Sequence, residues 1–266
     1  MTNEISTVGG VLGVTSVDDE LFVLLGQDNN QVAVYSINDY QLLRHLDLPG
    51  LKPHFFNDMT SCVRHKCLYM SECANRCIHR YDLPSSAVSK WPIPYKACGL
   101  SVTPSCNLLL TCRVESRGEP NKLIELSSDS GQCVREIALP ADIVCPWHGV
   151  QLTTGQFVVG HGHSTNSLQR LCVVGDDGKV TRSYGDKRGC DVGQLNYPRH
   201  LAVDNDSQFI SVADQFNNRV VLLSSTLEFV RYVSEGLSDP HRLHLHQATQ
   251  RLFIGHWSGD VTVIQL

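Results

Sequence analysis

The 266-residue sequence has no apolar run near the roughly 20 residues that a membrane-spanning helix requires. Its first residues, MTNEISTVGG, lack the basic start and the apolar centre of a secretory signal peptide. These two absences predict a cytoplasmic location and no membrane partner.

Charge and catalytic motifs are also scarce. Charged residues make up 18% of the chain and its formal net charge is −5 at pH 7, whereas a general nucleic-acid binder is usually basic. The sequence contains no G-x-S-x-G nucleophile elbow, no phosphate-binding loop and no H-E-x-x-H zinc motif. A binding protein is therefore the first expectation.

Cysteine, by contrast, is abundant, because the chain has 11 of them. Cys62, Cys67, Cys73 and Cys77 crowd one region, but their spacing is not the paired C-x2-C pattern of a structural zinc site. Without a secretory signal, we expect most of these cysteines to be reduced thiols that pack as small apolar side chains. Metal or disulfide roles stay open for the others.

The stretch that ends at Leu223 carries the clearest secondary-structure pattern. Short apolar runs predict strands at His200–Val203, Phe209–Val212 and Val220–Leu223, with a fourth at Leu227–Val233. Asp204-Asn205-Asp206 and Asn217-Asn218 separate the first three runs, and such residues tolerate the positive φ angles of tight hairpin turns. The stretch therefore predicts one antiparallel, up-and-down sheet.

The same pattern recurs along the chain. Glu20–Ser36 superposes on Gln208–Ser224 without a gap, which places Asn29-Asn30 on Asn217-Asn218. Looser copies give six equivalent apolar anchors, 40 to 52 residues apart, at Leu21, Leu68, Leu108, Phe157, Phe209 and Leu252. A four-stranded propeller blade needs about 40 to 50 residues.

This spacing predicts an all-β fold: a single, monomeric six-bladed β-propeller domain with four-stranded blades over residues 1–266. The sixth copy has only three strands before Leu266, and Asn3–Thr7 precedes the first blade without a partner of its own. We expect this N-terminal strand to complete the C-terminal blade, since a closed ring has no free sheet edges.

GQLNYPRHLAVD followed by FISVADQFNNRVVLL resembles the NHL repeat, the propeller module at the C-terminus of many tripartite-motif proteins. His200 and Leu201 stand at the Gly-hydrophobic positions of that pattern. The resemblance implies a non-catalytic binding or scaffold propeller that presents its loop face and central channel to a macromolecular partner, most often a protein. If the chain is part of a tripartite-motif-like ubiquitin ligase, the RING and the coiled coil of that ligase lie outside this chain.

The first strand of each blade is expected to line the channel, and six positions correspond at its start: Gly10, His54, Cys98, His148, Arg199 and His241. The last five, with His200, form the predicted binding site at the channel mouth. His54, His148 and His241 fall on alternate blades, and three imidazoles around an axis could hold zinc with a fourth position open for water.

The Pro53-His54 and Pro240-His241 pairs resemble the peptidyl-α-hydroxyglycine amidating lyase branch of these propellers, which implies a metal-dependent lyase or hydrolase as an alternative function. The other interpretation is that the histidines are hydrogen-bonded channel residues and that no cofactor is bound. The two interpretations stay open on the sequence alone.

Single-stranded RNA binding is a second alternative, because it needs a positive groove with stacking rings. The candidate residues for such a groove are Lys187, Arg188, Arg199, Arg219 and Arg242, with Tyr197. A solvated surface of mixed charge explains the same residues.

Overall fold

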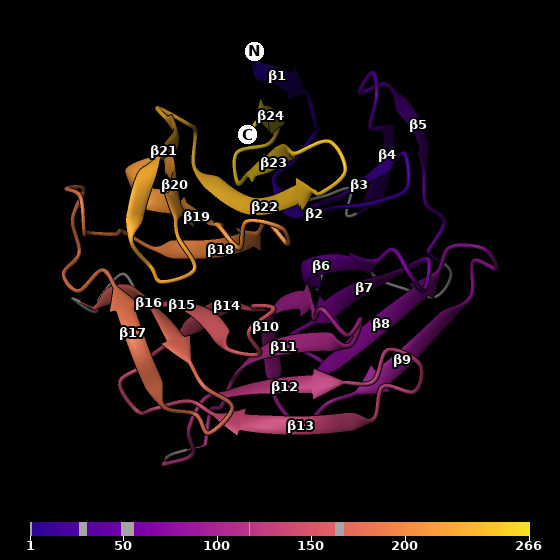
Figure 1. Cartoon of the computed structure of the whole chain (residues 1–266). Helices are drawn as coiled ribbons and strands as arrows, with labels where there is room; N and C mark the ends of the chain where they lie inside the picture. The colour runs from indigo at the N-terminus through magenta and orange to yellow at the C-terminus, as the bar shows by residue number, and fades with distance from the viewer. Residues whose placement is uncertain (1, 27–30, 49–55, 117, 163–167) are drawn as a thin grey trace.

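The computed structural model describes residues 2–26, 31–48, 56–116, 118–162 and 168–266 of the chain. They form six four-stranded antiparallel sheets, which stand around a central axis as the blades of a propeller (Figure 1). The all-β, six-bladed fold predicted from the repeats is confirmed. Within these ranges no helix is long and apolar enough to cross a bilayer.

Each blade is an up-and-down sheet. Blades 1 and 2 comprise β2 (Val11–Val17), β3 (Glu20–Leu25), β4 (Gln31–Ser36), β5 (Leu42–His45), β6 (Phe56–Cys62), β7 (Cys67–Glu72), β8 (Cys77–Asp82) and β9 (Val88–Pro92). Blades 3 and 4 comprise β10 (Lys96–Val102), β11 (Leu108–Arg113), β12 (Lys122–Leu126), β13 (Cys133–Ala138), β14 (Pro146–Gln151), β15 (Phe157–Gly162), β16 (Gln169–Val174) and β17 (Val180–Tyr184). Blades 5 and 6 comprise β18 (Pro198–Val203), β19 (Ile210–Asp214), β20 (Arg219–Leu223), β21 (Phe229–Glu235), β22 (Pro240–His246), β23 (Arg251–His256), β24 (Val261–Gln265) and β1 (Thr2–Ile5).

The N-terminal strand closes the ring. β1 is the outer strand of blade 6, where it pairs antiparallel with β24 so that Thr2 lies opposite Ile264 and Ile5 opposite Val261. Figure 1 shows the two chain ends near each other at this blade. The predicted closure is confirmed, with the strand at Thr2–Ile5 instead of Asn3–Thr7.

Six apolar cores hold the blades together, and each core lies between two neighbouring blades. For example, Phe22 and Leu24 of β3 pack in one cluster with Leu68 and Met70 of β7. Each sheet thus hides its two apolar faces against its neighbours, as stacked repeats must do. The inner strands β2, β6, β10, β14, β18 and β22 contact one another in a ring around the axis.

The cysteines largely follow the expectation. All 11 are free thiols. Cys62, Cys67, Cys112 and Cys172 are buried and pack in the apolar cores. Cys77 is buried beside polar side chains, and Cys133 and Cys190 are exposed.

The repeat alignment is wrong by one residue in blade 5. β3 and β4 pair Leu21 with Tyr35, whereas β19 and β20 pair Ile210, and not Phe209, with Leu223. Ile210 is accordingly buried and Phe209 is 38% exposed. One residue fewer separates the two strands in blade 5 than in blade 1.

The turns of blade 5 also differ from the expected two-residue hairpins. The chain forms a 3₁₀ turn, η2 (Gln215–Asn217), and then places Asn218 alone in the left-handed region at φ 53°. In the preceding turn, Gln208 adopts the positive φ expected within Asp204–Asp206. Asn29-Asn30, the aligned pair in blade 1, lies outside the described residues.

Every inner strand carries a β-bulge at the same place. The pairing with the second strand skips one residue in each blade: Leu12, Asn57, Cys98, Trp147, Arg199 and His241. The next residues in each blade are Gly13, Asp58, Gly99, His148, His200 and Arg242. Because a bulge bends a strand and redirects its side chains, these two sets serve different parts of the channel.

Because β1 closes the ring, we expect substitution of Ile5 to lower the stability of the protein strongly. Ile5 is 4% exposed and packs in the core between blades 6 and 1. Ile5→Ala should lower the free energy of unfolding by about 2–5 kcal/mol, measured by urea titration. The neighbouring exposed Glu4 gives the control, since Glu4→Gln should change it by less than about 0.5 kcal/mol. Equal effects of the two substitutions would show that β1 does not contribute to the ring in solution.

Candidate functional site

Four polar side chains that follow the bulges form a belt around the channel axis. We use "belt" for Asp58 of blade 2, His148 of blade 4, His200 of blade 5 and Arg242 of blade 6. All four side chains are buried, with 0–7% of each residue exposed. Gly99 stands at the equivalent position of blade 3. A Cβ there would lie 2.9 Å from Cα of His148, so glycine allows the close approach of the inner strands of blades 3 and 4.

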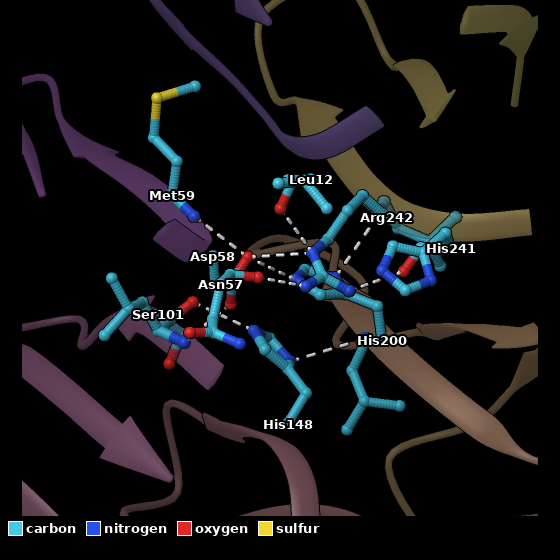
Figure 2. A network of polar contacts seen from close by, with 12 residues as sticks. Leu12, Asn57, Asp58, Met59, Ser101, His148, His200, His241 and Arg242 are labelled. Atoms are coloured by element: carbon cyan, nitrogen blue, oxygen red, sulfur yellow. Dashed lines mark hydrogen bonds and ion pairs between the residues drawn. The ribbon is translucent and has the colours of Figure 1, made fainter. Parts of the chain in front are cut away.

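Arg242 and Asp58 are the charged half of the belt, and Figure 2 shows Arg242 reaching from blade 6 toward Asp58. The Nε of Arg242 lies 3.0 Å from Oδ1 of Asp58 and donates to the carbonyl oxygen of Leu12 at 2.7 Å. An Nη of Arg242 also donates to the carbonyl oxygen of Asn57. Asp58 in turn accepts the backbone N–H of Leu100 at 2.8 Å. This one pair therefore connects blade 6 with blades 1, 2 and 3.

The same contacts keep the belt charged. Burial alone would raise the pKa of Asp58, but Arg242 and then His200 hold that pKa well below its ordinary value. Asp58 is therefore a carboxylate, and Arg242 has a buried counter-ion. An ion pair with this many backbone partners meets the conditions under which charges are tolerated inside proteins.

His148 and His200 are the uncharged half. The N–H of Leu201 donates to Nδ1 of His148 at 3.4 Å, so the proton of His148 is on Nε2, which lies 2.9 Å from the carbonyl oxygen of Leu100. The N–H of Leu243 donates to Nδ1 of His200 at 3.3 Å, and the two imidazole rings stack with centroids 3.6 Å apart. Burial and the neighbouring His200 lower the pKa of His148 to about 3. Burial also lowers the pKa of His200.

The belt contains one possible metal-ligand set. Ligand atoms of Asp58, His148 and His200 all lie within 4.8 Å of one another. However, both nitrogens of His148 and both oxygens of Asp58 already have backbone partners, and the Arg242 guanidinium would repel a cation beside Asp58. Only Nε2 of His200 lacks a hydrogen-bond partner. The donor set fits a metal ion poorly while Arg242 is in place.

A second set of this kind lies in blade 2. Nε2 of His79 is 2.9 Å from Oε2 of Glu72, and Sγ of Cys77 donates to the same oxygen at 3.0 Å. Asn75 donates to the other carboxylate oxygen. Glu72 is therefore satisfied by side chains of its own blade.

At the end of the channel where the inner strands finish, which we call the exit end, the structure has a cavity of ≈ 730 Å³. His148 and His200 of the belt are among its lining residues, and the walls include hydroxyl groups and the imidazoles of His244 and His246. Many of these groups bond to one another, as Ser16 does to His244 at 2.7 Å. The cavity can accept a small polar molecule.

At the opposite, entry end, where the inner strands begin, aromatic and cationic side chains gather. Cζ of Arg113 lies 3.6 Å and Cζ of Arg199 lies 3.8 Å from the centre of the Trp147 ring system. Tyr197 lies 5.0 Å from Trp147 between ring centroids and stacks on Phe216 at 4.7 Å. We use "arginine–tryptophan cluster" for Arg113, Trp147 and Arg199.

The structure corrects the equivalence assumed for the six channel positions. Cys98, Arg199 and His241 do occupy the same bulge position, but His148 lies one residue further along, level with His200, and Trp147 takes its place. In blades 1 and 2 the bulge position is held by Leu12 and Asn57, and not by the predicted Gly10 and His54. His54 lies outside the described residues, so the predicted zinc set of His54, His148 and His241 stays untested as a whole.

Two of the arginines predicted to contact RNA form ion pairs with buried aspartates instead. Nε of Arg219 lies 2.7 Å from Oδ2 of the buried Asp214, and Arg242 belongs to the belt. Of the predicted set, Arg199 and Tyr197 do come together at the entry end.

Sequence reasoning missed Asp58, Arg113, Trp147, Phe216 and Trp257. A signal for the belt existed in Pro146-Trp147-His148, Pro198-Arg199-His200 and Pro240-His241-Arg242, because the residue two positions after proline reaches the belt each time. No comparable signal marks Arg113, since it comes from the end of a second strand.

No protein-family model and no curated protein matches the chain. Solved structures do match it: a streptogramin B lyase (13% identity, TM-score 0.67) is covered over 87% of its length and covers 100% of this chain. The match to virginiamycin B lyase from Staphylococcus aureus (12% identity, TM-score 0.66) covers 100% of this chain and 99% of the lyase chain. The Cps50 (Swd1) β-propeller domain of Myceliophteria thermophila (12% identity, TM-score 0.66) covers 100% of both chains. At such identities these likenesses show the propeller fold alone.

The buried, uncharged state of His148 predicts a pH dependence of stability. An unfolded histidine protonates near pH 6.5, whereas His148 in the fold stays neutral down to about pH 3. Its contribution is therefore complete above pH 6.5 and should fall by about 1.4 kcal/mol for each pH unit below that value. Urea titrations between pH 7.5 and 4.5 should show a shallower pH dependence in His148→Gln than in the wild type. Substitution of the exposed His45 by Gln is the control, and an unchanged slope in His148→Gln would contradict the buried neutral ring.

Proposed function

We propose that this chain is a non-catalytic binding propeller that recognises a protein partner through its entry end. One observation carries the proposal: large aromatic side chains are exposed there, with Phe216 46% and Trp257 50% exposed. Trp257 lies against His241 with ring centroids 4.8 Å apart, and Phe216 continues the stack of Tyr197 and Trp147. Exposed aromatic rings beside arginine are typical of the centre of protein interfaces.

The belt supports a binding role in a second way. Most of its charged and imidazole groups are hydrogen-bonded to backbone atoms of the inner strands, so they stabilise the ring. The loops of the entry end can then bind a partner without disturbing the sheets, because loops on a rigid scaffold commonly carry the binding function. The NHL-type resemblance, a monomeric state and a cytoplasmic location agree with this role and stay predictions.

A matched pair of double variants tests the proposal. Phe216→Ser with Trp257→Ser removes the exposed rings of the entry end, and Val63→Ser with Phe209→Ser removes exposed apolar side chains of the exit end, which are 54% and 38% exposed. A partner captured by the wild type, identified by mass spectrometry and purified, should bind the entry-end variant at least about tenfold more weakly. It should bind the exit-end variant as the wild type does. Equal binding to both variants, or loss only with the exit-end variant, would contradict the proposal.

A metal-dependent lyase is the second candidate function, and the observation in its favour is that Asp58 converges with His148 and His200, which line the exit cavity. Two of the matching structures are lyases, although the likeness extends only to the fold. We expect protein purified without chelator to contain far less than one metal ion per chain, because Arg242 occupies Asp58. Stoichiometric metal by mass spectrometry that disappears in His200→Gln would instead establish the metal site.

A further inference from the structure

The arginine–tryptophan cluster has more positive charge than its surroundings balance. Several arginines form ion pairs with acidic side chains, among them Arg44, Arg76, Arg80, Arg135, Arg170, Arg219 and Arg242. Arg113 and Arg199 form no ion pair with any acidic residue that the structure describes. Both lie within 4 Å of the same indole, which spreads their charge over an aromatic face without neutralising it.

Two nitrogens of the cluster also lack hydrogen bonds. Nη2 of Arg113 and Nε of Arg199 are buried from solvent and have no partner. A buried charged donor that stays unsatisfied destabilises the fold, so folded proteins rarely retain such groups without a use. The indole itself is fixed, because its Nε1 donates to the carbonyl oxygen of Gly162 at 2.7 Å. The cluster is therefore rigid before any ligand arrives.

The electrostatic surroundings of the cluster point the same way. Burial, then Arg242, and also Arg113 lower the pKa of Arg199 to about 9. A hydrogen bond from Cys73, together with Arg113 and Arg199, lowers the pKa of the Cys98 thiol to about 7. Both shifts have one physical meaning, which is that this part of the entry end would be stabilised by a negative charge.

The shape and charge of the entry end decide which anion fits. A planar carboxylate accepts two parallel hydrogen bonds from a guanidinium, and its small charge matches two arginines. A long polyanion such as RNA would meet a chain whose formal net charge is −5 and which offers only this local positive site. Phe216, which stacks on the Tyr197 beside Trp147, and Trp257, which lies at the same end of the channel, are exposed and offer apolar surface that a peptide can cover.

We propose that the arginine–tryptophan cluster binds the carboxylate of an acidic residue in a peptide segment of the partner, with apolar residues of that segment packed on Phe216 and Trp257. This inference rests on the proposed protein-binding function and names the chemistry of the partner. The carboxylate balances the positive charge of Arg113 and Arg199, which are both partly exposed. Arg113 and Arg199 are then binding residues, and Trp147 positions both of them.

The test is a selection of displayed random peptides on the full chain, followed by affinity measurements with synthetic copies of the peptides selected. We expect the peptides to share an Asp or Glu between apolar residues, and exchange of that acid for its amide should weaken binding at least about tenfold. Arg113→Gln and Arg199→Gln should each weaken binding as much. Arg64→Gln, which changes an exposed arginine at the exit end, should leave binding unchanged.

Stability measurements on the same variants separate binding from a structural role. Because Arg199 has no counter-ion in the free protein, Arg199→Gln should leave the midpoint of urea unfolding unchanged or raise it. A large loss of stability in Arg199→Gln would show that this arginine serves the fold, and would overturn the inference.

The other outcomes are equally distinct. Peptides without acids, or acids whose binding ignores both arginine variants, would overturn the carboxylate assignment. So would displacement of the peptide by inorganic phosphate or oligouridylate at equal concentration, which would identify a phosphate ligand. If no peptide is selected while the purified partner still depends on Phe216 and Trp257, the inference fails and the proposed function stands.

Discussion

Six sheets that meet at one axis present six inner edges, and the backbone groups of those edges need hydrogen-bond partners inside the protein. Here the belt supplies them. Asp58, His148 and His200 each accept a backbone N–H from a neighbouring inner strand, and Arg242 donates to carbonyl oxygens of the next two blades. The belt is therefore the interaction on which the closed ring depends, because the apolar cores join blades in pairs whereas the belt joins them across the axis.

The belt also divides the channel into two unlike ends. His148 and His200 lie at the base of the exit cavity, which is lined by hydroxyls and imidazoles that are mostly paired with one another. The bulge residues on the other side contribute Trp147 and Arg199, and Nε of Arg199 has no hydrogen-bond partner. A shift of one residue along each inner strand thus separates structural side chains from those available for binding.

The sequence predicted the blade number, the strand order and the closure by the N-terminal strand, because apolar runs and turns repeat at a nearly constant interval. It predicted the site less well, for a local reason. Each bulge adds one residue to one strand, and Pro240-His241-Arg242 taken by itself does not show which residue is the extra one. The shared proline marks that residue only when Pro146, Pro198 and Pro240 are aligned. His148 and His241 were therefore aligned although they occupy successive positions. Cation–π contacts such as Arg113 on Trp147 join residues 34 positions apart, so they appear only in three dimensions.

Pairing of β1 with β24 has a consequence for synthesis of the chain. Ile5 belongs to the first of the described strands to be synthesised, whereas its partner Val261 belongs to the last of them, β24. Until then the nascent blade 1 lacks the apolar surface of blade 6 that covers one of its faces. That apolar face of blade 1 therefore stays uncovered until the ring closes, since local sheets form early and distant contacts form last.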